Sequence, residues 1–150
     1  MAQTTSAQSA RNVVVEHSTD GSSWTDCSGL ANTIKWDGGE RETGNTHTFT
    51  GDAPVHTRGK LGESTVVLNA IYTESGSEVA RIAHTAYKNG TPFYLRWAPL
   101  GATTGNIRYT TSAGTVKNPV VPTEMKADSA DALAVEISLE CPSIADAAIP

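Results

Sequence analysis

The chain has 150 residues, a length typical of a single domain. Hydrophobic residues make up 38% of it and charged residues 18%, while 20 Thr, 13 Ser and 13 Gly favour strands and turns. This composition excludes a coiled coil, a membrane-spanning segment and a basic nucleic-acid-binding domain, so we expect no membrane insertion.

The negative charge of the chain is confined to its C-terminal part. Residues 1–123 carry ten acids and ten bases, which cancel. Residues 124–150 hold six acids against Lys126 alone and therefore carry the whole net charge of −5. Such a surface repels polyphosphate and does not bind it.

The first elements are an arm and a hairpin. Residues 1–11 are rich in Ala, Ser, Thr and Gln without periodicity, which predicts a flexible N-terminal arm. Residues 13–24 predict a β-hairpin with its turn at Asp20-Gly21.

A strand containing Ile34 and Trp36 is followed by an unusual segment. Residues 37–63 contain six glycines, charges of both signs and few apolar side chains. A stretch of this length without structure is uncommon in a domain unless it has a function. It predicts a long polar hairpin loop, with one strand at residues 46–50.

Residues 65–73 predict a strand with apolar side chains on both faces. We expect it to be central in its sheet and covered on both sides. A helix is predicted next, because apolar residues recur with helical spacing at Val79, Ile82, Ala83 and Ala86. Ser75 and Glu78 have the spacing of a capping box before it, and Asn89-Gly90 predicts its end.

The last third of the chain predicts more strands. These are residues 93–97, a strand around Ile107 and Tyr109, an edge strand at residues 116–121, and residues 133–140. Residues 141–150 predict a short C-terminal tail, which leaves residues 12–140 as the folded domain. About seven or eight strands and one helix predict a mainly β fold, a β-sandwich or partly open barrel with one flanking α-helix.

The patterns typical of enzymes and metal sites are absent from the sequence. There is no G-x-S-x-G, and Asn45 follows Gly39 and Gly44 where a P-loop needs Lys. Cys27 and Cys141 predict buried thiols, and His84 is expected on the exposed face of the helix. We therefore expect no catalytic residue, no cofactor and no metal, and a protein that is not an enzyme.

Two further groups of side chains allow alternatives. Glu136 and Glu140 share one strand face with Ser138, about 13 Å apart by strand rise, which is too far for a glycosidase pair. The face is either an ordinary solvated surface or the wall of an assembly's interior. The three tryptophans fall at strand positions where core packing is expected, whereas exposed ones would form a platform for sugars (Trp24, Trp36 and Trp97).

Five segments stand out in order along the chain: VEHSTDGSSWTD at residues 15–26, GERETG at 39–44, FTGD at 49–52, IYTE at 71–74 and YLRWAP at 94–99. Their order and spacing across about residues 12–140 resemble the tail tube (major tail) proteins of long-tailed bacteriophages. The resemblance implies a β-sandwich with a flanking helix, six copies in each ring, and rings stacked into a hollow tube that conducts DNA.

The resemblance also implies partners and a location. The chain would be a virion protein, assembled in the bacterial host cytoplasm, that meets copies of itself, the tape measure protein and other tail proteins. Double-stranded DNA would pass transiently and without specific binding. A related possibility within the same structural class is a tube subunit of a contractile or secretion apparatus. The alternative function is a glycan-binding or adhesion β-sandwich module of a phage tail.

Two candidate surfaces follow from the resemblance. The face that bears Glu136, Ser138 and Glu140 is expected to line the lumen, where carboxylates repel DNA. The hairpin of residues 37–63 and the two termini are expected to contact neighbouring subunits. The charged hairpin residues expected in contacts between rings are Asp37, Glu40, Arg41, Glu42, Asp52, Arg58 and Lys60.

Overall fold

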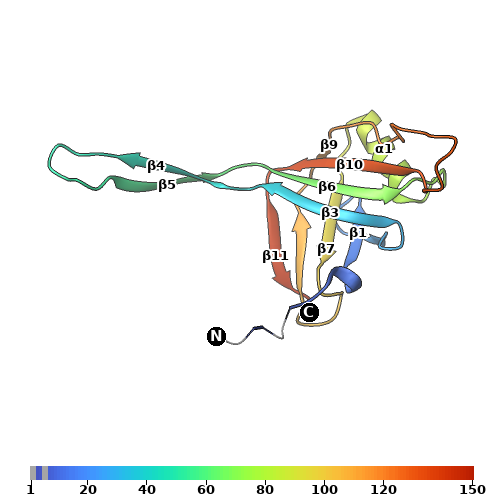
Figure 1. Cartoon of the computed structure of the whole chain (residues 1–150), viewed down its shortest axis with the longest axis horizontal. Helices are drawn as coiled ribbons and strands as arrows, with labels where there is room; N and C mark the ends of the chain where they lie inside the picture. The colour runs from blue at the N-terminus through green and yellow to red at the C-terminus, as the bar shows by residue number, and fades with distance from the viewer. Residues whose placement is uncertain (1–2, 5–6) are drawn as a thin grey trace.

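The chain forms two packed β-sheets from which a long two-stranded arm projects (Figure 1). The computed structural model describes residues 3–4 and 7–150. These residues include eleven strands and one α-helix, and the sheets do not close into a barrel. The predicted mainly β sandwich with a flanking helix is confirmed.

One sheet has five antiparallel strands. They are β1 (Val14–Ser18), β2 (Thr25–Asp26), β7 (Tyr94–Ala98), β8 (Ile107–Thr111) and β11 (Ile144–Ala148). Their order is β11-β8-β7-β1-β2, which makes β11 and β2 the edges. The hairpin predicted at residues 13–24 is present, but its second strand begins one residue later than predicted, at Thr25, where Glu16 of β1 stands opposite Asp26 of β2.

The other sheet has four strands in the order β3-β6-β10-β9. They are β3 (Ala31–Gly38), β6 (Ser64–Ile71), β9 (Thr115–Val116) and β10 (Ala134–Cys141). Strand β6 is central in this sheet, as predicted, and pairs with both β3 and β10. The edge strand predicted at residues 116–121 is wrong for most of its length, because β9 ends at Val116 and residues 117–121 form no strand.

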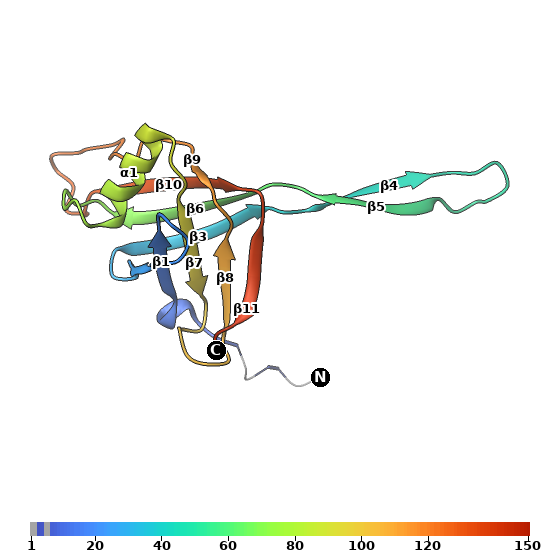
Figure 2. The same ribbon diagram turned by 180° about the vertical axis from the view of Figure 1, so that it is seen from behind.

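The core lies between the two sheets, whose strands cross at a large angle (Figures 1 and 2). Alternate residues of β6 and β10 supply much of it, Val66, Leu68 and Ala70 from one strand and Val135, Ile137 and Leu139 from the other. The opposite face of β6 is only half-buried, and Ile71 is 40% exposed. The expectation that β6 is covered on both sides is therefore wrong, because no layer built from the described residues packs outside this sheet.

Helix α1 (Val79–Asn89) lies beside β9 and β10 and buries its apolar stripe against the core. Gly90 ends it with a φ of +65°, as predicted. The predicted capping box is wrong: Glu78 is the N-cap residue, and its carboxylate accepts a hydrogen bond from the Thr73 hydroxyl. The prediction of an exposed His84 is also wrong, since this half-buried ring accepts a hydrogen bond from the Val120 amide at 3.3 Å.

The arm consists of β4 (Arg41–Thr46) and β5 (Val55–Leu61), paired as a sheet of their own. Figure 2 shows it projecting well beyond the sandwich. The strand predicted at residues 46–50 is wrong, because β4 ends at Thr46 and residues 47–54 form the connection at the tip. The long polar hairpin itself is present.

The two ends of the chain differ from each other. Part of the predicted N-terminal arm, residues 1–2 and 5–6, lies outside the described residues, and Ala10–Asn12 form a short 3₁₀ helix. The segment predicted as a C-terminal tail contains β11, which pairs with β8 along five residues. The C-terminal segment is thus part of the five-stranded sheet.

Candidate functional site

The outer face of the four-stranded sheet carries the first candidate surface. Glu136, Ser138 and Glu140 alternate along β10 with buried apolar residues and point away from the core. They stand opposite Asn69, Val67 and Thr65 of β6, respectively. The structure therefore brings the three predicted residues together on one open face.

Glu140 belongs to a charged cluster at one end of this face. Lys117, just after β9, places its Nζ 2.8 Å from the Glu140 carboxylate. The hydrogen bond with Lys117, together with one from Glu63, lowers the pKa of Glu140. Through the same hydrogen bonds and its negative charge, Glu140 raises the pKa of both Lys117 and Glu63.

The face is not uniformly acidic. Lys35 lies 3.1 Å from the carboxylate of Asp37 near the end of β3, and Asp37 stands opposite Thr65. Asp37, predicted as a residue of the hairpin, therefore lies on the same face as Glu140. No local pattern in the sequence places Lys35, Lys117 or Glu63 on this face, because their proximity depends on how strands distant in sequence are paired.

The arm carries the second candidate surface. Arg41 and Glu42 lie on β4, Arg58 and Lys60 on β5, and Asp52 in the connection at the tip. These side chains are exposed and form no ion pairs with the described residues. Arg41 donates a hydrogen bond to the carbonyl of Gly59 at 2.9 Å. Their charged groups are therefore available to pair with charges on another subunit.

The root of the arm continues the pairing of β3 with β6. The Gly39 amide donates to the carbonyl of Glu63 at 2.8 Å, and the Gly62 amide donates to the carbonyl of Glu40 at 2.7 Å. Gly38 and Gly39 have φ values of +80° and +73°, which other residues rarely adopt. A Cβ on Gly38 would lie 2.4 Å from the Glu63 carbonyl oxygen. These glycines allow a continuous ribbon to run from the sheet into the arm.

The tryptophans do not form one exposed platform. Trp97 is 8% exposed and packs in the core, as expected. Trp36 is 43% exposed, so the expectation of core packing is wrong for it, although its Nε1 donates to the Ser64 hydroxyl at 3.1 Å. Trp24 is half-buried, with the Arg96 guanidinium 4.4 Å from its ring centroid.

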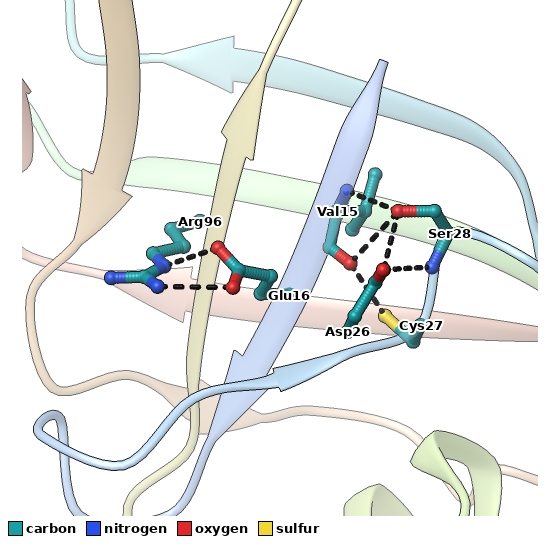
Figure 3. A network of polar contacts seen from close by, with 6 residues as sticks. All are labelled: Val15, Glu16, Asp26, Cys27, Ser28 and Arg96. Atoms are coloured by element: carbon teal, nitrogen blue, oxygen red, sulfur yellow. Dashed lines mark hydrogen bonds and ion pairs between the residues drawn. The ribbon is translucent and has the colours of Figure 1, made fainter. Parts of the chain in front are cut away.

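A polar network fixes the strands of the five-stranded sheet (Figure 3). Arg96 of β7 makes a bidentate contact with Glu16 of β1, including 3.0 Å between Nη2 and Oε1. The carboxylate of Asp26 accepts from the amide and hydroxyl of Ser28, whose hydroxyl oxygen accepts from the Val15 amide. These contacts hold β2 and the turn after it against β1.

Across residues 3–4 and 7–150, no group of three or more His, Cys, Asp or Glu is placed to hold a metal ion. No helix in this described part is long and apolar enough to cross a membrane.

Comparison with known proteins gives matches in structure only. No family model and no curated protein matches the sequence. A chain of the six-fold symmetrised anti-feeding prophage baseplate matches with a TM-score of 0.70 and 10% identity, covering 98% of this chain and 99% of that chain. A chain of the PVC sheath-tube complex, from an extracellular contractile injection system, matches at 0.67 and 12%, covering 97% and 94%.

The SPP1 tail tube matches with a TM-score of 0.64 and 12% identity, covering 91% of this chain and 77% of that chain. Identities this low establish the fold. The resemblance to tail tube proteins inferred from the sequence is thus confirmed for the architecture. This chain has the fold shared by tube and related components of phage tails and contractile injection systems.

Proposed function

We propose that the chain is a structural, non-enzymatic subunit of a phage tail tube, in which six copies form a ring and stacked rings form a conduit for DNA. The observation that carries this proposal is the match over nearly the whole chain to the anti-feeding prophage baseplate chain, whose structure was six-fold symmetrised. The free sheet edges and the projecting arm supply surfaces suited to the two contacts that such a tube needs.

Contacts within a ring require two different surfaces that meet around a closed circle. Both sheets have unpaired edges, and β3 and β11 are longer than the two-residue edge strands β2 and β9. An unpaired strand edge offers backbone groups to a neighbouring chain. We assign the contacts within a ring to these longer edges.

Contacts between rings are assigned to the arm. Its side chains are nearly all exposed, so the two strands bury almost nothing against each other. An isolated two-stranded hairpin is marginally stable in water. Docking on the next ring stabilises it, and six such contacts per ring act together even when each is weak.

The lumen is assigned to the face of Glu136, Ser138 and Glu140. Carboxylates on this wall repel DNA, while several lysine contacts to phosphate would hold it. Glu136 forms no ion pair with the described residues and so keeps its charge free. The tape measure protein would occupy the same channel before DNA enters, and the other tail proteins would meet the two ends of the tube.

Electron microscopy of the concentrated protein tests the proposal. We expect rings or tubes with six-fold symmetry from the wild-type chain. A variant with residues 40–61 replaced by a two-residue Asn-Gly turn should stay folded, because the core lies outside the arm, and should form no tubes. Monomers alone in the wild-type sample, or normal tubes from the shortened variant, would contradict the respective assignments.

A further inference from the structure

A cavity lies between β1, β3 and β7, beside the 3₁₀ helix at the N-terminal end. Its volume is about 600 Å³, within the range of pockets that hold small ligands. Val13, Val15, Ile34 and Trp97 give it an apolar lining, and the exposed Arg11 is also among its lining residues. We call it the edge cavity.

The tip of the arm presents an apolar side chain that no described residue covers. Phe49 lies in the connection of residues 47–54 and is fully exposed, on an arm that is otherwise mostly polar. Phenylalanine is among the residues most often buried in proteins.

Charge links the tip to the edge cavity. Asp52 lies three positions after Phe49 in the same connection, and Arg11 lines the cavity. Neither residue forms an ion pair within the described part of the chain. An aromatic ring beside a carboxylate thus matches an apolar cavity beside a guanidinium.

We propose that Phe49 of one copy inserts into the edge cavity of a second copy, with Asp52 beside Arg11. The occupant is a second copy because both views show the arm leaving the sandwich, so that a chain's own tip lies far from its own cavity (Figures 1 and 2). This inference rests on the proposed function and names the two surfaces that meet between rings.

The contact between tip and edge cavity can be repeated as further copies are added. Tip and cavity are different surfaces of one chain, so their contact is heterologous. Each added copy uses one tip and one cavity and leaves another of each free. Contacts of this kind propagate along an axis unless a rotation closes them, which suits the stacking of rings.

Disulfide cross-linking between two single variants tests the contact directly. Phe49→Cys and Val13→Cys copies, mixed and oxidised under assembly conditions, should form a covalent dimer that neither variant forms alone. Cys27 and Cys141 are buried and do not interfere. Gln3→Cys copies are mixed with Val13→Cys copies in a parallel experiment. If this mixture forms the covalent dimer and the mixture with Phe49→Cys does not, the N-terminal segment is the occupant of the edge cavity and the proposal is overturned.

The concentration needed for assembly, measured by pelleting, gives a second test. Phe49→Ala should raise it about tenfold, because the apolar area buried by the ring is lost. Val55→Ala, which trims another exposed apolar residue of the arm, should change it less than about twofold. Arg11→Glu and Asp52→Lys should each raise it, and the two together should restore assembly.

The outcomes separate this inference from the proposed function. Normal tubes from Phe49→Ala, or no rescue in the doubly reversed variant, would overturn the contact and leave the tube proposal standing. A wild-type chain that forms no rings or tubes would overturn both. Phe49 lies far from the core, so each arm variant should keep the wild-type unfolding midpoint, which confirms that assembly alone has changed.

Discussion

At the scale of single residues, the buried His17 couples the stability of the sandwich to pH. Its side chain stacks on Phe93, with ring centroids 5.9 Å apart, and its Nδ1 has no hydrogen-bond partner among the described residues. Burial lowers the pKa of His17, because the charged ring would lose its water. The fold therefore holds a neutral imidazole under conditions where the unfolded chain binds a proton.

The sign of the pH effect follows from this difference. The full stability is present above the ordinary pKa of 6.5 and decreases as the pH falls toward the folded-state pKa. We expect the thermal unfolding midpoint to drop between about pH 7.5 and about pH 5.5. His17→Leu should remove most of that drop. His47→Gln, at the exposed tip of the arm, should keep it, and an unchanged drop in His17→Leu would contradict this explanation.

The cysteines show how far residue type alone predicts the environment. Both were expected to be small buried fillers, and both are buried and free. Burial, with the charges of Asp26 and Glu16, raises the pKa of Cys27 to about 12, and burial also raises the pKa of Cys141. Their thiols remain protonated at neutral pH and react slowly.

At the scale of elements, the glycines at the root of the arm determine whether the ribbon can form. Gly38→Ala places a Cβ against the Glu63 carbonyl at a φ of +80°. We expect a loss of about 1–3 kcal/mol in the free energy of unfolding, measured in urea. Gly29→Ala, which meets nothing within 4 Å, should change it by less than about 0.5 kcal/mol. Equal stability of the two variants would show that the root of the arm accepts a side chain at position 38 without strain.

Elements with a strong hydrophobic period were predicted well from the sequence. Strand β10 and helix α1 each bury a regular stripe, so alternation and helical spacing reveal them directly. The outward positions of Glu136, Ser138 and Glu140 followed from the same alternation. Spacing alone failed at Ser75 and Glu78, because Thr73 provides Glu78 with a different hydrogen-bond partner.

Elements held by backbone pairing were predicted poorly. The side chains of β4 and β5 are nearly all exposed, so no alternation marks their ends and a strand was placed wrongly at residues 46–50. Strand β11 contains one large apolar residue, Ile144, and is fixed by its register with β8. Contacts such as Lys117 with Glu140 depend on that kind of pairing and have no local signal in the sequence.

At the scale of the whole molecule, the fold divides the acidic C-terminal segment among different surfaces. Glu124, Asp128 and Asp131 lie in the connection between β9 and β10, and Asp146 lies on the edge strand β11. Two of the six acids, Glu136 and Glu140, are on the face assigned to the lumen. The net charge of the segment therefore overstates the charge of that wall.

Reversing these two charges tests the assignment of the lumen. The double variant Glu136→Lys and Glu140→Lys should still form tubes, because both side chains point away from the core. It should slow DNA delivery about tenfold or more, since added lysines bind phosphate. Infectivity of particles built from the variant measures the effect. The control variant Glu124→Lys with Asp128→Lys makes the same change of charge outside this face, and its particles should deliver DNA normally. Normal infectivity of the variant with Glu136→Lys and Glu140→Lys would contradict the assignment of the lumen.

The pairing of β3 with β6 continues into the arm, with a shift of register between Arg41 and Thr43, and this has a mechanical consequence. Hydrogen bonds between antiparallel strands run across the direction of the chain. A pull on the tip along the ribbon is carried by both strands of the arm into β3 and β6, and it loads the bonds between β6 and β10 in shear, many at once. A pull across a pair of strands would open its bonds one by one. If neighbouring subunits are joined through the arm, bending or stretching of the assembly is resisted by backbone bonds that reach from Thr46 and Val55, at the base of the tip, to β6 in the four-stranded sheet.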